Sequence, residues 1–268
     1  MSLLPIIRIK EFLEEEFSDG TTRPMLVLGE DGKKYVLKIF SKRDAAQRPY
    51  VAAEVLANLL AKQFNLFVPS AAYLTIDNAL LDFVENNQPK INEVLQLKHT
   101  DGIHFGTEYH PGLPMFTPSK NDKLLELDEY ESILAFDTLI ANEDRKKHKP
   151  NILRGEKNYL LIDHEKAFEG LECIYTNVNN GILPNFFSYH IFYKRLRVLA
   201  KTKSEEINFE TFEDFFRLIS FVEIEENIRF LIQNGCDESK CYEWLFYIKK
   251  QKENCTNFVT LLNRKIRE

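Results

Sequence analysis

The chain has 268 residues, of which 44% are hydrophobic and 28% charged, as expected for a globular protein with one large or two modest domains. Its formal net charge of −6 argues against a nucleic-acid or membrane partner, because both need a basic surface. The opening segment lacks the apolar core of a signal peptide, and no run approaches the ~20 apolar residues of a membrane helix. We therefore expect a soluble, cytoplasmic protein whose four cysteines are reduced thiols.

Strands with one helix are predicted for the first third of the chain. The Glu30-Asp31-Gly32 sequence is typical of a hairpin turn, and Asp77-Asn78 indicates a second turn. Residues 47–64 place apolar side chains at helical spacing and predict a helix that carries Glu54. The predicted strands cover residues 6–9, 24–28, 35–40, 66–76, 80–84 and 104–109.

After the last of these strands the pattern becomes helical. The segment 110–114 contains two prolines and a glycine, and we place a hinge there. A long helix is predicted at 124–141, and two short strands at 151–153 and 159–162 flank a turn. The part from residue 184 to the end reads as helices rich in Phe and Tyr.

The fold class that follows is α+β. Residues 1–109 are expected to form a small lobe, an antiparallel sheet with one helix. Residues 110–268 are expected to form a second, mainly helical lobe.

Three polar residues in the second part suit phosphoryl transfer. Asp144 lies in a polar loop after the long helix, Asn151 follows seven residues later, and Asp163 ends an apolar run. An aspartate can orient an acceptor hydroxyl and take its proton, so Asp144 is the catalytic candidate, with Arg145 beside it to favour the charged carboxylate. Carboxylate and amide oxygens are ligands that Mg²⁺ accepts, so Asn151 and Asp163 are the metal candidates.

A matching set lies in the first part. Lys38 is near the end of a strand, where its ammonium group could neutralise nucleotide phosphates, and Glu54 could hold it by a charge-assisted hydrogen bond. The segment Gly20-Thr21-Thr22 could wrap phosphates through its backbone N–H groups. Each also has a purely structural interpretation: a solvated lysine, a surface glutamate and a plain hairpin turn.

At these positions the chain resembles the HipA-like kinases, in particular their compact stand-alone branch, and at the same loops the phosphoinositide 3- and 4-kinases. The resemblance spans residues 20–170, and the last hundred residues carry none. The matching segments are Gly20-Thr21-Thr22-Arg23-Pro24, Tyr35-Val36-Leu37-Lys38, Ala53-Glu54-Val55-Leu56-Ala57, Ala141-Asn142-Glu143-Asp144-Arg145, Asn151-Ile152-Leu153 and Leu161-Ile162-Asp163-His164-Glu165.

The resemblance implies a two-lobed protein-kinase-like fold that uses ATP and Mg²⁺. The γ-phosphoryl group would pass to an acceptor hydroxyl, expected on a protein Ser or Thr or on the chain itself. By the same resemblance Lys38 contacts the phosphates, Glu54 orients Lys38, and Glu108 and Tyr109 present their backbone to adenine. A regulatory protein partner is left open.

Two features depart from the family pattern. Six residues, 145–150, separate Asp144 from Asn151, where the family usually has four. Asp163-His164-Glu165 stands where most protein kinases have Asp-Phe-Gly. Two alternatives therefore stay open. One is a catalytically impaired module of kinase fold that binds a nucleotide or a partner. The other is a kinase for a lipid or small molecule, whose anionic group could meet the basic run 145–149.

Overall fold

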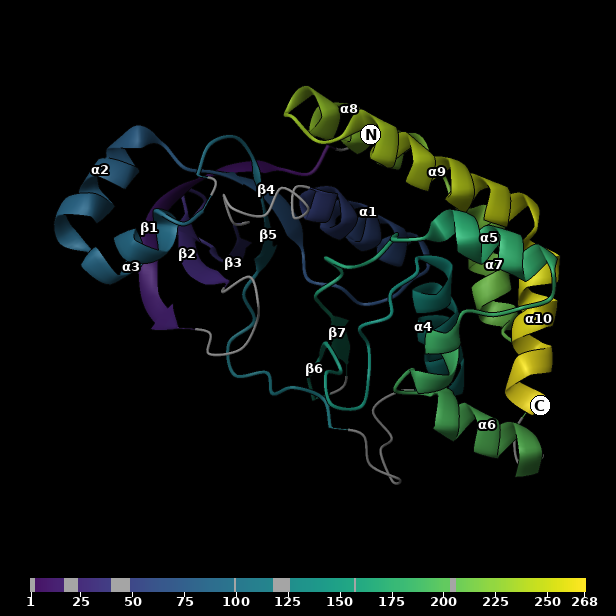
Figure 1. Ribbon diagram of the computed structural model, residues 1–268. Helices are drawn as coiled ribbons and strands as arrows, with labels where there is room; N and C mark the ends of the chain where they lie inside the picture. Colours follow the sequence, from purple (N-terminus) through teal and green to yellow (C-terminus); the bar gives the residue numbers. More distant parts are fainter. Residues whose placement is uncertain are drawn as a thin grey trace.

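The structure, a computed structural model, describes residues 3–16, 24–39, 49–98, 100–117, 126–156, 158–202 and 206–268. Five strands form a closed barrel in the order β1-β2-β3-β5-β4 (Figure 1). Neighbouring strands are antiparallel except β1 and β4, which run parallel where the barrel closes, so the predicted antiparallel sheet holds for the other pairs. The strands are β1 (Ile6–Glu16), β2 (Met25–Gly29), β3 (Lys34–Lys38), β4 (Ala71–Thr75) and β5 (His104–Glu108).

Two helices that the sequence did not predict complete the barrel's own core. They are α2 (Asn78–Asn87) and α3 (Pro89–Leu95), and both contribute side chains to the cluster that contains Tyr35 and Leu37 of β3. The strand predicted at 80–84 is therefore wrong. Asp77 does not form a turn between strands but caps α2, where its Oδ1 accepts a hydrogen bond from the Leu80 N–H at 2.7 Å.

Helix α1 (Pro49–Gln63) confirms the predicted helix and is buried along almost its whole length. It packs against Tyr73 and Phe105 on the outer face of the barrel and against the C-terminal helices. Helix α8 (Val222–Gln233) crosses close to it (Figure 1). On α8 the buried Asn227 accepts hydrogen bonds from the Leu4 N–H at 3.2 Å and the Tyr73 hydroxyl at 3.0 Å. Helix α8 is thus hydrogen-bonded to β4 and to the segment that precedes β1.

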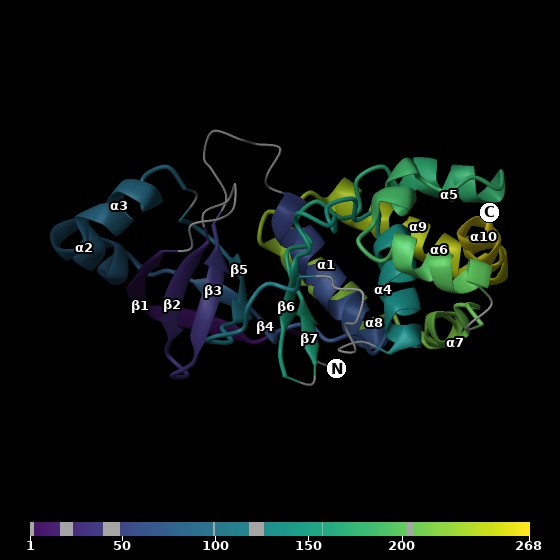
Figure 2. The same cartoon turned by 90° about the horizontal axis from the view of Figure 1, so that it is seen from below.

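The remaining helices pack into one large apolar core, as predicted for this part of the chain. The short hairpin of β6 (Ile152–Arg154) and β7 (Tyr159–Leu161) lies between the barrel and these helices (Figure 2). Among the described residues, no helix combines the length and the hydrophobicity needed to cross a bilayer. The helices are α4 (Leu127–Leu139), α5 (Leu171–Asn179), the 3-10 helix η2 (Asn185–Tyr189), α6 (Tyr193–Thr202), α7 (Glu210–Leu218), α9 (Glu238–Glu253) and α10 (Cys255–Arg267).

Candidate active site

Lys38, at the end of β3, lies at the centre of the site. Side chains alternate along the strand, so Leu37 enters the barrel core and Lys38 points to the outer face, toward α1. Its Nζ donates a hydrogen bond to Glu54 Oε1, as predicted, and another to Asp163 Oδ1 at 2.6 Å. Burial opposes the charge of this amine, but Glu54 and Asp163 outweigh that effect and raise the pKa of Lys38. Lys38 is therefore a charged group held between carboxylates.

Glu54 fixes the position of β3 relative to the segment that follows β7. Its side chain is only 2% exposed, because α1 is packed between the barrel and the helical core. One carboxylate oxygen binds Lys38, and the other accepts a hydrogen bond from the backbone N–H of His164 at 3.1 Å. Burial raises the pKa of Glu54. The glutamate thus connects β3 with the segment that follows β7.

Asp163 and Asn151 flank the β6–β7 hairpin. The Ile162 N–H donates to the Asn151 carbonyl oxygen at 3.0 Å, so the two predicted metal ligands are brought together. Both have left-handed backbones, with φ of 62° at Asp163 and 50° at Asn151. Such conformations cost free energy in residues other than glycine and concentrate at functional sites. Burial opposes the charge of Asp163, but Lys38 and Lys149 outweigh it and lower the pKa of Asp163.

The insertion before Asn151 forms a tight loop rather than disordering the site. The backbone of Lys146 and Lys149 exchanges two hydrogen bonds, at 3.0 and 3.1 Å. The Lys149 ammonium then reaches Asp144 Oδ2 at 2.5 Å and Asp163 Oδ2 at 3.2 Å. In the sequence this lysine is only one member of a basic run. It is the cation next to Asp144, the role that we expected for Arg145.

Arg145 instead points into the core, and the residue as a whole is 1% exposed. Its Nε binds Asp137 Oδ2 at 2.5 Å, and its guanidinium donates to the Asn151 carbonyl oxygen at 2.5 Å. It also lies 3.0 Å from Nε2 of His164. Because it holds the backbone of Asn151 and the side chain of His164, the neighbour of Asp163, its geometry is that of a positioning residue.

Two histidines complete this buried network. His190 Nε2 lies 2.9 Å from Asp137 Oδ2. Burial opposes the charge of Asp137, but Arg145 and His190 outweigh it and lower the pKa of Asp137. Burial and the nearby Arg145 lower the pKa of His164 to about 3, so this imidazole is neutral near pH 7. The buried network is therefore centred on the ion pair between Asp137 and Arg145, and it supports the loop after α4.

The oxygen atoms gathered here fit a divalent cation. Single carboxylate oxygens of Glu54, Asp163 and Glu165 all lie within 4.8 Å of one another. The amide Nδ2 of Asn151 is buried and has no hydrogen-bond partner among the described residues. The two ends of an amide differ only in O and N, so turning this group would place an acceptor oxygen there, as a metal needs. Glu165 was not among the predicted ligands.

Comparison with known proteins identifies the family. The family model described as HipA-like kinase matches residues 9–218. The chain belongs to the HipA-like kinase family. Its match to a crystal structure of a Helicobacter pylori proinflammatory kinase, CtkA, has a TM-score of 0.54 at 12% identity and covers 96% of this chain and 95% of that one. The match to the crystal structure of the Golgi casein kinase with Mn/ADP bound has a TM-score of 0.51 at 11% identity. It covers 100% of this chain and 75% of that one. The comparison with curated protein sequences gives no match.

At such low identity these structures establish a kinase-like α+β fold for this HipA-like chain, as predicted. Two segments were predicted to contact a nucleotide. The phosphate-binding segment Gly20-Thr21-Thr22 lies outside the described residues. At the proposed hinge, the Glu108 N–H donates to the Ser70 carbonyl at 2.8 Å and the Tyr109 N–H to the Lys34 carbonyl at 2.9 Å. The backbone N–H groups of Glu108 and Tyr109 are thus already bonded to the Ser70 and Lys34 carbonyl groups. A backbone N–H that binds adenine would have to come from a later residue.

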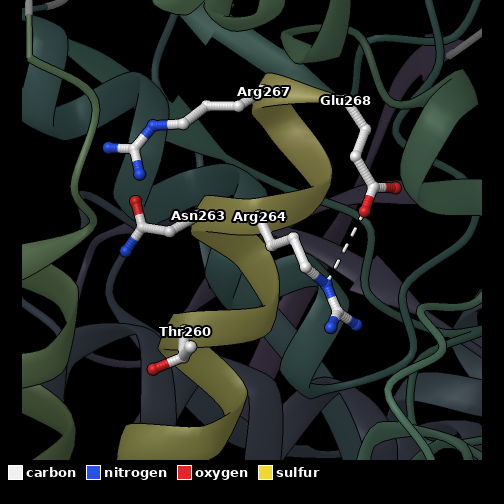
Figure 3. Close-up of a pocket in the computed structure, with 5 residues that line it drawn as sticks. All are labelled: Thr260, Asn263, Arg264, Arg267 and Glu268. Atoms are coloured by element: carbon white, nitrogen blue, oxygen red, sulfur yellow. Dashed lines mark ion pairs between the residues drawn. The ribbon is translucent and has the colours of Figure 1, made fainter.

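A hollow of about 610 Å³ lies elsewhere, on the last helix of this HipA-like kinase (Figure 3). In Figure 3, Arg264 and Glu268 are joined by an ion pair, which measures 3.6 Å. Asn263 and Arg267 bind backbone carbonyl groups just before α7. These contacts fasten α10 to its neighbours, and none of the hollow's residues belongs to the Lys38 site. The lining residues are Thr260, Asn263, Arg264, Arg267 and Glu268.

Proposed function

We propose that this chain is an ATP- and Mg²⁺-dependent kinase that transfers the γ-phosphoryl group to a protein Ser or Thr hydroxyl, on another protein or on itself. The observation that carries the proposal is the meeting of Lys38, Glu54 and Asp163. These residues come from β3, from α1 and from the segment after β7, yet Lys38 contacts both carboxylates. Membership of the HipA-like family supports a kinase-type phosphotransferase.

Each residue has a role that follows from its chemistry. Lys38, kept charged by Glu54, would bind the nucleotide phosphates. Asp163 and Asn151 would hold Mg²⁺, which when bound neutralises the phosphate charge. Asp144 would orient the acceptor hydroxyl and accept its proton as the phosphoryl group is transferred. Arg145 acts through Asn151 and His164, whose positions it holds.

The nucleotide would lie between a small lobe, 1–109, and a helical lobe, 110–268. The Golgi casein kinase that shares this fold was solved with Mn/ADP bound, which supports the use of a nucleotide and a divalent metal here. Protein Ser or Thr as the acceptor, and a regulatory protein partner, are part of the proposal by family resemblance.

One observation favours a second function, a nucleotide-binding module without transfer. Lys149 binds both Asp144 and Asp163, at 2.5 and 3.2 Å. While Lys149 stays there, it occupies the carboxylate oxygen that an acceptor hydroxyl would need. The hydroxyl can bind Asp144 only after this charge-assisted hydrogen bond is broken. In the kinase the lysine must turn away, or move onto the phosphates, when nucleotide and metal enter.

Transfer of label from γ-labelled ATP distinguishes the two functions. The wild type, Asp144→Ala and the control Glu143→Ala would each be incubated with Mg²⁺, alone and with a protein extract. Glu143 is the exposed neighbour of Asp144. A kinase labels protein in the wild type and the control, and loses labelling in Asp144→Ala. Nucleotide binding without labelling in any of the three proteins supports the module.

A further inference from the structure

Glu165 is a buried carboxylate that the mechanism above does not use. It lies two residues after Asp163, and its side chain is 4% exposed. Its Oε2 is 3.8 Å from the Lys38 ammonium and has no hydrogen-bond partner in the part of the chain that the structure describes. A buried carboxylate oxygen without a hydrogen bond is costly unless a cation or a proton neutralises the group.

The charges around Glu165 do not balance. Ion pairs connect Lys38 with Glu54, Asp163 and Glu165, and Lys149 joins Asp163 to Asp144. Four carboxylates therefore share two ammonium groups in this connected set of described residues. When all are ionised, two negative charges remain within this ion-paired set, and one divalent cation supplies the opposite charge. The charge of Lys166 also acts on Glu165 from outside the set and lessens this excess.

We propose that Glu165 and Asp163, with Glu54 as the third carboxylate, bind a divalent cation beside Lys38. This site is additional to the one proposed for Asp163 and Asn151. Its place in phosphoryl transfer rests on the proposed function, whereas the site itself rests on the geometry of these three residues.

The donor set selects the kind of ion. All ligands are carboxylate oxygens, which suit hard cations such as Mg²⁺ and Mn²⁺. Oxygen ligands about 2.1 Å from one ion are at most about 4.2 Å apart. The three oxygens already lie within 4.8 Å of one another, so a small contraction closes them around an ion. The ion would then neutralise part of the carboxylate charge that now holds Lys38, so the ammonium group can turn toward the phosphates.

Mn²⁺ titration of the full chain without nucleotide tests this site directly. Free Mn²⁺ is followed by its paramagnetic resonance signal for the wild type, Glu165→Gln and the control Glu169→Gln. Glu169 is an exposed glutamate four residues further along. We expect Glu165→Gln to weaken Mn²⁺ binding by about tenfold or more, because it removes one charged ligand. Glu169→Gln should stay within about threefold of the wild type.

Two results overturn the proposal: a wild type that binds no Mn²⁺, or a Glu165→Gln variant that binds it as tightly as the wild type. In either case Glu165 is neutralised by a proton. The glutamine is isosteric and lowers the excess of negative charge beside Lys38, so the metal-free variant should unfold at the wild-type temperature or above it. If it does not fold, Glu165→Met, of similar volume, serves as the second variant with the same expectation.

Failure of this inference and failure of the proposed function give different results. Loss of the Glu165 site leaves label transfer from ATP intact through Asp163 and Asn151. A protein that binds Mn²⁺ through Glu165 but never transfers label keeps the metal site and contradicts the kinase.

Discussion

The Lys38 ammonium is oriented before any nucleotide arrives. Glu54 and Asp163 hold it from α1 and from the end of β7, and its side chain is only 12% exposed. An amine fixed in this way loses little conformational entropy when it meets a phosphate group. The same contacts explain why neither carboxylate can be replaced without disturbing the lysine.

Removing either side of this junction should abolish most turnover. We expect Lys38→Ala and Asp163→Asn each to lower kcat by two or more orders of magnitude, about 3 kcal/mol of barrier, because each removes charge neutralisation at the phosphates. Single-turnover transfer from γ-labelled ATP measures the effect. Lys34→Ala, an exposed lysine on the same strand, is the control. Near wild-type turnover in Lys38→Ala would show that the amine does not serve the reaction.

Arg145 is expected to matter more for stability than for chemistry. Arg145→Ala leaves the fully buried Asp137 without its main partner, and breaking a buried pair of this kind costs about 3–5 kcal/mol. Urea unfolding gives the free energy of unfolding directly. Lys147→Ala, an exposed change in the same loop, should stay within about 0.5 kcal/mol of the wild type. An unchanged free energy of unfolding in Arg145→Ala would contradict the positioning role.

Asn151 tests whether the inserted loop leaves the metal site intact. If its amide oxygen binds Mg²⁺, Asn151→Ala should raise the Mg²⁺ concentration for half-maximal transfer by about tenfold, because one ligand is lost. Transfer rates measured over a series of Mg²⁺ concentrations give this value, with Asn158→Ala as an exposed control on the same hairpin. An unchanged Mg²⁺ dependence would mean that the insertion has moved Asn151 off the metal.

At the scale of elements, sequence periodicity located most strands and helices of the site but not α2 or the full length of β1. Leu80 and Val84 are four residues apart and share the buried side of α2, a spacing that also fits a short apolar strand. The N-cap Asp77 was the available signal. Strand β1 continues to Glu16, although the prediction ended at residue 9. The pairing with β2 is irregular between Ile9 and Glu11, which interrupts the alternation of side chains on which the prediction depends.

The sequence already indicated the main site residues, because their order matches that of the HipA-like kinases. These residues are Lys38, Glu54, Asp144, Asn151 and Asp163. Sequence could not reveal Lys149 or Glu165, since a basic run and a lone glutamate usually face solvent. Only the fold shows that the loop folds back on itself and that Glu165 is buried beside Lys38. Strand alternation places Lys38 on the same face as Val36 but does not say which face lies outside the barrel, and the inward turn of Arg145 had no local signal.

Helix α4 carries a second buried carboxylate with a measurable consequence. Glu131 Oε2 accepts a hydrogen bond from the Phe209 N–H at 2.6 Å, at the start of α7. Burial raises the pKa of Glu131 to about 7. A group whose pKa is raised by folding stabilises the protein at low pH, and this contribution is lost as the pH rises through the folded value.

The free energy of unfolding should therefore fall between about pH 5 and about pH 8 through Glu131, and Glu131→Gln should remove that part of the fall. At about pH 8 we expect the variant to be more stable than the wild type by about 1–3 kcal/mol. Urea unfolding at both pH values, with the exposed Glu210→Gln as control, measures it. A variant with the wild-type pH dependence would contradict the assignment.

At the scale of the whole molecule, the barrel and the helices meet at α1. The Tyr73 ring of β4 packs on Phe230 of α8 with centroids 4.7 Å apart, and Asn227 adds hydrogen bonds to Tyr73 and Leu4. At the other end of α1, Phe64 stacks on Phe212 of α7 at 4.7 Å. The C-terminal helices, to which the sequence assigned no role, thus fix the helix that carries Glu54.

The central claim is that Lys38 and Asp163 grip one metal–nucleotide from opposite sides. A crystal structure of the chain with Mg²⁺ and a non-hydrolysable ATP analogue tests it most directly. The account predicts the Lys38 ammonium within hydrogen-bond distance of a phosphate oxygen, and a metal ion bonded to Asp163 and to the phosphates. A nucleotide bound elsewhere, or a metal that Asp163 does not touch, would contradict it.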